Sequence, residues 1–182
     1  MTVDLKNIQI RDAAPQDVRG INNVVYQAWL VTYPNEEYGI TREDIEDDYK
    51  DVFTEESITK REESMRNIPE NQKRLVAVYE GKIVGVSTTV RNEDNNQLRT
   101  IYILPEFQGK GIGKMLYAEA IKFCDKNKKL IVQVATYTTD AIEFYKKLGF
   151  VDKGNRFTEE RFRFKSGVII PEMELEIEAG KF

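Results

Sequence analysis

The stretch of sequence that decides the fold reads Leu98-Arg99-Thr100-Ile101-Tyr102-Ile103-Leu104-Pro105-Glu106-Phe107-Gln108-Gly109-Lys110-Gly111-Ile112-Gly113-Lys114. Residues 98–104 are mostly apolar and their number suits a buried strand, which Pro105 ends because proline cannot donate to a sheet ladder. The following apolar residues recur at helical spacing, namely Ile112, Met115, Leu116, Ala120, Phe123 and Cys124. The pattern predicts a strand, a glycine-rich turn and a helix that begins near Gly111.

A glycine-rich turn between a strand and a helix suits an anion. The first amides of a helix have no partner within the helix, and the helix dipole places partial positive charge there. The glycines allow a phosphate to approach the backbone closely, and Lys110 and Lys114 add positive charge at the same end. From the residues alone we predict a phosphate or pyrophosphate site.

Two common phosphate-binding fingerprints do not fit this turn. The triphosphate loop needs G-x-x-x-x-G-K-[ST], but Gly109 and Gly113 are too close together. The dinucleotide fingerprint needs G-x-G-x-x-G, and its last position is Lys114. What remains is Gln-x-x-Gly-x-Gly over residues 108–113, which resembles the acyl-coenzyme A loop of the GNAT superfamily of N-acetyltransferases. The preceding segment 101–107 is similar to the strand and loop of that family.

A second block strengthens the resemblance. Residues 130–135 are typical of a strand, and the segment after them contains Ala141, Phe144, Tyr145, Gly149 and Phe150. This Ala-x-x-Phe-Tyr-x-x-x-Gly-Phe pattern is similar to the second conserved block of the GNAT family. Only residues 98–150 carry specific motifs, whereas the order of elements agrees with the family over almost the whole chain.

The predicted elements alternate between helix and strand along the chain. We expect helices over 15–33, 41–53, 54–68, 111–124 and 139–148, and strands over 7–11, 75–79, 83–90, 98–104, 130–136, 161–165 and 169–177. The fold class is therefore α/β, and the resemblance implies a mixed, mostly antiparallel sheet flanked by helices. We expect one domain over residues 1–182.

Composition narrows the function classes. The chain is 32% charged and 41% hydrophobic, with no run near the roughly 20 apolar residues of a membrane span and no apolar signal core at the N-terminus. Its single cysteine allows no internal disulfide, and its net charge of −4 argues against a nucleic-acid partner. We therefore predict a cytoplasmic protein that binds neither membrane nor nucleic acid. A homodimer is left open.

The chain contains no histidine. This excludes serine–histidine and cysteine–histidine machineries and removes the commonest zinc ligand, so we expect no metal. A general base must be a carboxylate, a tyrosine, an amine or water.

The resemblance implies that acetyl-coenzyme A is the co-substrate. In the GNAT family the strand before the loop splays from its neighbour, and its backbone meets the pantetheine arm. The implied cofactor-binding residues are Ile101, Tyr102, Ile103, Gln108, Gly109, Lys110, Gly111, Ile112, Gly113, Lys114 and Thr138. Thr138 stands where the family often has an asparagine that contacts the pantetheine arm.

Tyr145 is the predicted catalytic residue. It shares a helical face with Ala141, Phe144 and Leu148, so from the residues alone it is a buried aromatic side chain. The resemblance implies instead that its hydroxyl donates a proton to the departing thiolate. Cys124 lies on an apolar stripe and is expected to be a buried structural thiol.

The general base stays unassigned. Some relatives use a glutamate on the strand that contains Gln133, and others one near Gln97, but a glutamine cannot accept a proton in this way. Water relayed through Tyr102 or backbone carbonyls is one alternative, and Glu36, Glu37, Glu93 and Asp94 are others.

Acceptor recognition is implied to involve the first helices and the loop between them. This region contributes Trp29, Tyr33, Glu36, Glu37 and Tyr38. Aromatic and acidic groups suit a cationic amine. Between Glu36 and Glu63 the chain has 12 acidic and 4 basic residues, which favours a small polycation slightly, although a solvated helix face is the alternative.

The predicted function is transfer of an acetyl group from acetyl-coenzyme A to a primary amine. Polyamines, a protein N-terminus or lysine, and aminoglycosides are the candidate acceptors. The alternative is a non-catalytic acyl-coenzyme A sensor, favoured by Gln97 and Gln133 and opposed by Tyr145.

Overall fold

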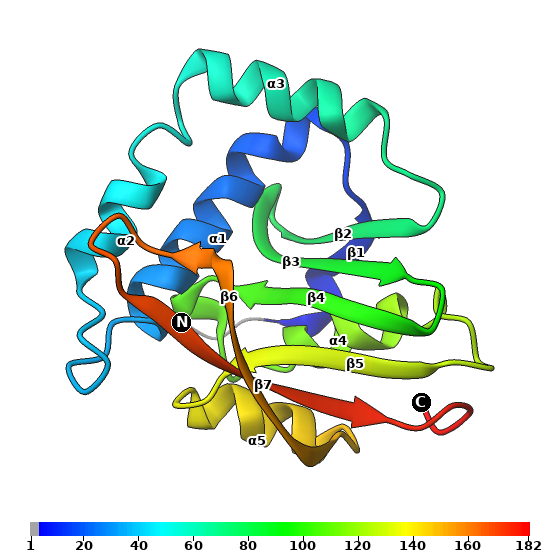
Figure 1. Ribbon diagram of the computed structural model, residues 1–182. Coiled ribbons are helices and arrows are strands. Elements are labelled where there is room, and N and C mark those ends of the chain that lie inside the picture. The colour runs from blue at the N-terminus through cyan, green and yellow to red at the C-terminus, as the bar shows by residue number, and fades with distance from the viewer. Residues whose placement is uncertain (1–3) are drawn as a thin grey trace.

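A computed structural model describes residues 4–182, and its centre is one seven-stranded sheet (Figure 1). The strand order is β1-β2-β3-β4-β5-β7-β6. The strands are β1 Ile8–Asp12, β2 Gln72–Tyr79, β3 Lys82–Arg91, β4 Asn95–Ile103, β5 Lys129–Ala135, β6 Val151–Arg163 and β7 Ile169–Ile177. All neighbours are antiparallel except β4 and β5, which confirms the mixed, mostly antiparallel sheet.

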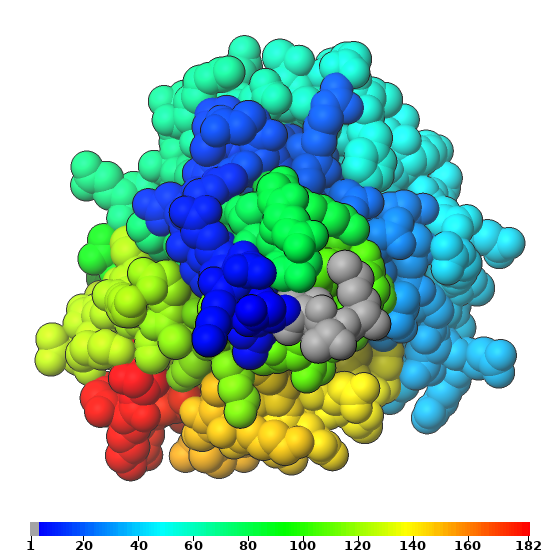
Figure 2. Space-filling view, turned by 180° about the vertical axis from the view of Figure 1, so that it is seen from behind, coloured from blue at the N-terminus to red at the C-terminus, as the bar shows by residue number. Residues whose placement is uncertain are grey.

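Within residues 4–182, five α-helices flank this sheet. They are α1 Val18–Thr32, α2 Arg42–Tyr49, α3 Glu55–Arg66, α4 Ile112–Ala120 and α5 Thr139–Lys147, with short 3-10 turns at Leu5–Asn7, Pro15–Asp17 and Pro105–Phe107. In Figure 1, α3 lies along the top of the molecule and α5 along the bottom, beside β5 and β7. Figure 2 shows the opposite side, where the gold surface of α5 forms the lower edge below the blue N-terminal segment. No helix among residues 4–182 is long and apolar enough to cross a membrane.

The two faces of the sheet bury different clusters beyond β4. Val132 and Val134 of β5 pack in the main core with Leu116 of α4 and Tyr145 of α5. Ala135 of the same strand packs in a second cluster whose other members include Leu30, Trp29, Tyr33 and Ile170. Because side chains alternate along a strand, α1 therefore covers one face of β5 and β7 while α4 and α5 cover the other.

Strands β4 and β5 pair only over their first halves. The parallel pairing joins residues 95–98 of β4 to residues 129–132 of β5, whereas β4 continues to Ile103 and β5 to Ala135. The far half of β4 pairs with β3 alone. The splay that the family resemblance implied is thus present, and it leaves one edge of β4 free of sheet partners.

Two predicted boundaries are corrected. The helix after the glycine turn ends at Ala120 instead of Cys124, because the amides of residues 122–124 bond to carbonyls three positions back and close a tight turn. The strand predicted over 161–165 is β6, which starts at Val151. Its early part is mostly exposed, so it lacks the alternating apolar pattern that marks a half-buried strand.

Candidate active site

A cavity of about 900 Å³ opens where β4 and β5 diverge. It brings together most of the predicted site residues, namely Tyr33, Ile101, Tyr102, Ile103, Gln108, Gly109, Gly111, Ile112, Gly113, Lys114, Thr138 and Tyr145. They come from α1, β4, the glycine turn, α4 and α5. Segments far apart in the sequence therefore form one continuous wall.

The glycine turn has the backbone that the motif predicted. Gly109 and Gly111 have φ angles of 70° and 87°, in the left-handed region that favours glycine. Gly111 is the N-cap of α4, and the Gln108 amide group holds the start of the turn by donating to the Ile103 carbonyl at 3.1 Å. Within residues 4–182, the amides of residues 109–113 donate to no backbone carbonyl, so they are free to bind an anion.

Of the two lysines predicted to add positive charge at this turn, Lys114 lines the cavity and Lys110 does not. Lys110 does not line the cavity, because its ammonium donates to the Glu106 carbonyl at 2.7 Å. Lys114 does line it, and Lys147 at the end of α5 adds a second ammonium group that the sequence analysis missed. The helix N-terminus and the nearby lysines predicted positive charge at this turn. Lys147 is distant in sequence and joins the cavity wall only because α5 packs beside α4.

The wall contributed by β4 contains a β-bulge. Thr88 pairs with Thr100 and Thr89 pairs with Leu98, so Arg99 has no partner on β3. A bulge bends its strand and is common next to active sites. Arg99 lines the cavity, and the sequence analysis did not single it out.

Tyr145 lines the same cavity as the glycine turn and is only 5% exposed. Its ring packs edge-on against Phe144 and Phe150, with centroids 5.2 and 5.4 Å away. Burial, and to a lesser degree the nearby Tyr102, raises the pKa of Tyr145 above its ordinary value. The hydroxyl therefore stays protonated at neutral pH and can act only as a proton donor in its resting state.

Thr138 lines the cavity, but its hydroxyl is already engaged. The hydroxyl donates to the Ala135 carbonyl at 2.8 Å and so closes the turn between β5 and α5. Because its proton is used in this bond, the Thr138 hydroxyl oxygen can only accept a hydrogen bond from a ligand.

The side chains of Gln97 on β4 and Gln133 on β5 are hydrogen-bonded to each other near the point where the two strands diverge. The Gln97 amide donates to the Gln133 side-chain oxygen at 3.0 Å, and the same oxygen accepts from Arg161 at 3.1 Å. Arg99 donates in turn to the Gln97 oxygen at 3.3 Å. This row of polar side chains contains two cations and no proton acceptor.

The predicted acceptor residues separate in the structure. Tyr33 lines the cavity, and its hydroxyl lies 2.9 Å from that of Tyr102. Trp29 packs against Tyr33 with tilted rings, 4.3 Å between centroids, and does not line the cavity. Glu36 is exposed in the loop after α1 and also lies outside the wall, so its predicted place in the cavity is corrected.

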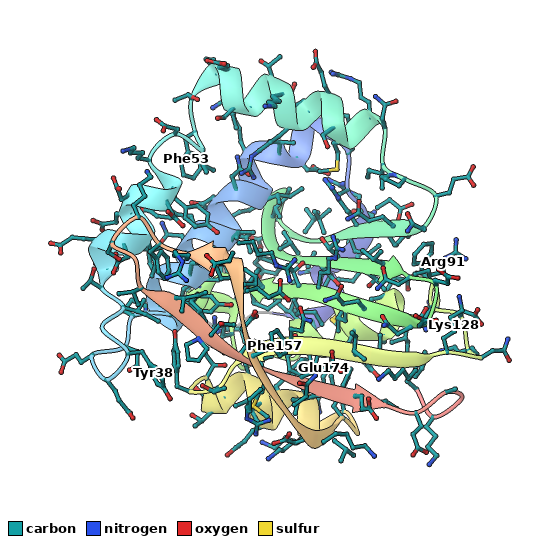
Figure 3. The ribbon with its side chains drawn as sticks, in the orientation of Figure 1. Tyr38, Phe53, Arg91, Lys128, Phe157 and Glu174 are labelled. Atoms are coloured by element: carbon teal, nitrogen blue, oxygen red, sulfur yellow. The ribbon has the colours of Figure 1, made fainter. Side chains whose placement is uncertain are left out.

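The loop after α1 instead supplies aromatic contacts to the cavity rim. Tyr38, labelled in Figure 3, projects from this loop and stacks on Tyr137 at 5.0 Å between centroids. Tyr137 lines the cavity and donates its hydroxyl to the Tyr33 carbonyl at 2.9 Å. No residue of the acidic block 36–63 lines the cavity as the structure describes it.

One carboxylate near this site escaped the sequence analysis. Glu172 of β7 is 5% exposed, and burial, strengthened by Glu159 and opposed by Arg161, raises its pKa from 4.5 to about 7. Its negative charge adds to the burial that raises the pKa of Tyr33 and of Tyr102. The only sequence signal was its place in an alternating strand that also contains Glu174 and Glu176.

Comparison with known proteins agrees with this geometry. A family model described as an acetyltransferase (GNAT) domain matches residues 38–167. A curated relative, an uncharacterized N-acetyltransferase of Methanocaldococcus jannaschii, is 35% identical over 68 residues, which make up 36% of this chain and 30% of that protein. The match thus spans less than a third of that relative.

Solved structures share the fold over nearly the whole chain. A GCN5-related N-acetyltransferase from Rhodopseudomonas palustris aligns with a TM-score of 0.69 at 18% identity, covering 98% of both chains. The PaiA N-acetyltransferase from Thermoplasma acidophilum, crystallised with coenzyme A, aligns with a TM-score of 0.64 at 22% identity, covering 91% of this chain and 98% of that one. Identities this low show the fold alone. The family model, which matches well over half of the residues, shows that this chain belongs to the GNAT acetyltransferase family.

Proposed function

We propose that this protein transfers an acetyl group from acetyl-coenzyme A to a primary amine. One observation carries the proposal: the glycine turn that caps α4, the free edge of β4 and the buried Tyr145 all line the same cavity. An anion site, an open strand edge and a proton donor are the parts that a bound thioester requires.

Acetyl-coenzyme A would lie along this cavity. The free amides of residues 109–113 would bind the pyrophosphate, with the Lys114 and Lys147 side chains adding charge attraction. The pantetheine arm would extend along the free edge of β4 at residues 101–103 and pass Thr138. The PaiA N-acetyltransferase from Thermoplasma acidophilum, which shares this fold, was crystallised with coenzyme A, and this supports a coenzyme A thioester as the co-substrate.

The acetyl group would move in one direct transfer. The amine nitrogen attacks the thioester carbonyl and the carbon–sulfur bond breaks, leaving an amide and coenzyme A. A backbone amide near Ile103 would polarise the carbonyl, and the Tyr145 hydroxyl would donate its proton to the thiolate. The proton that the nitrogen loses on becoming an amide restores Tyr145.

The acceptor class is a primary amine, and the preference for a small polycation stays a prediction. The acidic block on which it rests is partly neutralised, because Lys165 contacts Asp47 and Arg19 contacts Glu55. Arg99 in the cavity wall, joined through Gln97 and Gln133 to Arg161, favours a second candidate acceptor. That candidate is an amine whose skeleton also carries a carboxylate, such as an amino acid or a peptide.

We treat residues 1–182 as a single cytoplasmic domain in this proposal. The continuous sheet from β1 to β7 supports one domain. Size-exclusion chromatography with light scattering would test whether the protein is a homodimer.

The test measures acetyl-coenzyme A consumption by thiol release with a panel of polyamines, amino acids, aminoglycosides and short peptides. We expect turnover with one class of amine. Binding of coenzyme A without turnover on any acceptor would favour the sensor alternative, and absence of coenzyme A binding would refute the proposal.

A further inference from the structure

The proposed reaction needs a proton acceptor that the residues named so far do not supply. Some relatives have a glutamate at the position of Gln133 and others near Gln97, but here the Gln97 amide donates a hydrogen bond to the Gln133 side-chain oxygen. Tyr145 is protonated and lies on the α4 and α5 side of the sheet. A further ionisable group is therefore required on the side from which the acceptor amine approaches.

Glu172 is a buried carboxylate with one oxygen that has no partner among residues 4–182. Its side-chain oxygen Oε2 is inaccessible to solvent and has no hydrogen-bond partner among residues 4–182. An unpaired carboxylate oxygen in such a place costs free energy. A buried group of this type next to a cavity is a candidate functional residue, because a purely structural role would leave its oxygens bonded.

Strand pairing places Glu172 beside the cavity on the α1 side of the sheet. Glu172 is opposite Ala135, which lines the cavity, and residues opposite each other in a sheet point to the same face. Met173 points the other way, into the core that contains Tyr145. Glu172 itself does not line the cavity; it lies next to the lining residue Ala135, on the sheet face opposite the one that carries Tyr145.

The neighbours of Glu172 leave it free to take a proton. On β6 its register partner is Phe157, and Figure 3 labels this residue together with Glu174 two positions along β7. The charged groups that face it from β6 are Glu159 and Arg161. Arg161 contacts Glu159 and donates to Gln133, so this cation is already engaged.

The remaining groups that face Glu172 are neutral at pH 7. They are Tyr33 of α1 and Tyr102 of β4, whose pKa values are raised by burial first and further by the Glu172 charge. Their rings form an aromatic wall with Trp29 behind it, and aromatic faces attract an ammonium group. The environment therefore suits a cation beside the carboxylate.

Resting on the proposed function, we propose that Glu172 is the general base that takes a proton from the acceptor ammonium, directly or through one bridging water. The ammonium proton moves to a Glu172 oxygen and leaves a neutral amine with a free electron pair. That pair forms the carbon–nitrogen bond and the carbon–sulfur bond breaks, as described above. Glu172 then returns its proton to solvent, so each turnover releases one proton overall.

The protonation equilibrium of Glu172 agrees with this role. Burial raises its pKa to about 7, near the neutral pH at which a general base is most effective. Glu174 and Glu176 share its face of β7 but are less buried, and Glu176 is paired with Lys129 at 2.8 Å. Glu174 and Glu176 are therefore less buried glutamates on the same strand face with which Glu172 can be compared.

The experiment compares Glu172→Gln with Glu174→Gln as the matched control. Both variants are assayed for acetyl-coenzyme A binding by calorimetry and for kcat/KM between pH 5.5 and pH 9 on the best amine of the panel. We expect Glu172→Gln to lower kcat/KM by about 10²- to 10⁴-fold. We also expect it to abolish the rise of kcat/KM with pH near 7 and to leave coenzyme A binding within twofold. Glu174→Gln should resemble the wild type, and Glu172→Asp should recover part of the rate.

Retention of the pH-dependent rise, or of kcat/KM within threefold, in Glu172→Gln would overturn the assignment while leaving the proposed function intact. A wild type that binds acetyl-coenzyme A but acetylates no amine would overturn the proposed function, and the base role with it. These two failures are distinguishable, because only the second appears in the unmodified protein.

Unfolding in urea gives a readout that needs no turnover. Because the pKa of Glu172 is raised by folding, its contribution to stability is present below 4.5 and is lost as the pH rises through about 7. Glu172→Gln should therefore gain stability relative to wild type between these values and hold that gain above them. A difference that does not change with pH would overturn the assignment.

Discussion

At the scale of the residue, Tyr145 decides between an enzyme and a sensor. Its hydroxyl is the one atom that Tyr145→Phe removes, and the ring contacts with Phe144 and Phe150 are kept. We expect kcat to fall by about 10²- to 10⁴-fold with coenzyme A binding unchanged, because general acid assistance is lost and packing is not.

Steady-state kinetics and calorimetry check this result. Tyr117→Phe is the matched control, since Tyr117 is a buried tyrosine of the same core that lies outside the cavity wall. Full activity in Tyr145→Phe would show that another group protonates the thiolate.

Gly111 holds the left-handed backbone conformation on which the predicted anion site depends. A Cβ atom there would meet only Leu5, at 3.7 Å, so Gly111→Ala introduces strain from its φ of 87° and no clash. The left-handed conformation costs an alanine about 1–2 kcal/mol. We expect a loss of unfolding free energy of this size in urea, together with weaker coenzyme A binding as the turn relaxes.

Gly81→Ala separates the two effects. Gly81 has a similar φ of 79° and no atom within 4 Å of its Cβ position, but it lies in the β2–β3 turn, outside the cavity wall. It should lose stability while coenzyme A binding stays normal. Equal binding by both variants would mean that the Gly111 backbone does not hold the anion site.

At the scale of the element, the stability of α2 depends on its N-cap residue more than the stability of α3 does. Thr41 accepts from the Asp44 amide at 3.1 Å while the Asp44 carboxylate accepts from the Thr41 amide at 2.8 Å, which completes a capping box. Thr54 of α3 accepts from Ser57 at 3.3 Å with no reciprocal bond from an acidic side chain. We expect Thr41→Ala to cost about 1 kcal/mol and Thr54→Ala less, measured by urea unfolding. A larger loss for Thr54→Ala would contradict the ranking.

The splayed element is the part of the fold that sequence patterns describe least. Residues 98–104 are mostly apolar, and this pattern is the same for a strand paired on both edges and for one paired on a single edge. The bulge at Arg99 and the loss of pairing after Leu98 come from contacts with β3 and β5. Only the family resemblance anticipated the splay, and nothing in the residues anticipated the bulge.

At the scale of the whole molecule, a partly buried ion pair joins the first strand to the turn that leads into the first helix, and it makes stability depend on pH. Asp17 is 5% exposed and accepts from Arg11 at 2.6 and 2.8 Å and from the Ala14 amide at 2.8 Å. The bonds from Arg11 lower the pKa of Asp17 against the effect of burial, so this stability is present above its unfolded value of 3.8 and is lost as the pH falls through the folded value.

Asp17→Asn should therefore cost about 2 kcal/mol at pH 7, and the difference from wild type should shrink below pH 4. Urea unfolding between pH 3 and pH 8 measures it. Asp12→Asn removes an exposed partner of Lys73 and should change stability little at any pH. A constant difference for Asp17→Asn across the range would assign the loss to packing instead of charge.

What the sequence by itself determined is local. Periodicity, proline and glycine placement, and capping residues predict most helices and strands because these signals act within a few residues of the chain. The glycine motif likewise predicted an anion site, since a single turn of helix with free amides suffices for it.

Only the tertiary structure decided which side chains contact one another and how far each one is buried from solvent. Glu172, Glu174 and Glu176 are identical in the alternating pattern, yet only Glu172 lies beneath the aromatic cover of α1, with one oxygen that has no partner in the part of the chain that the structure describes. Trp29 and Glu36 are near Tyr33 in sequence, yet only Tyr33 reaches the cavity. A pKa and a line of approach depend on the atoms packed around a group, and those atoms come from α1, β4 and β6, distant segments that a local pattern cannot bring together.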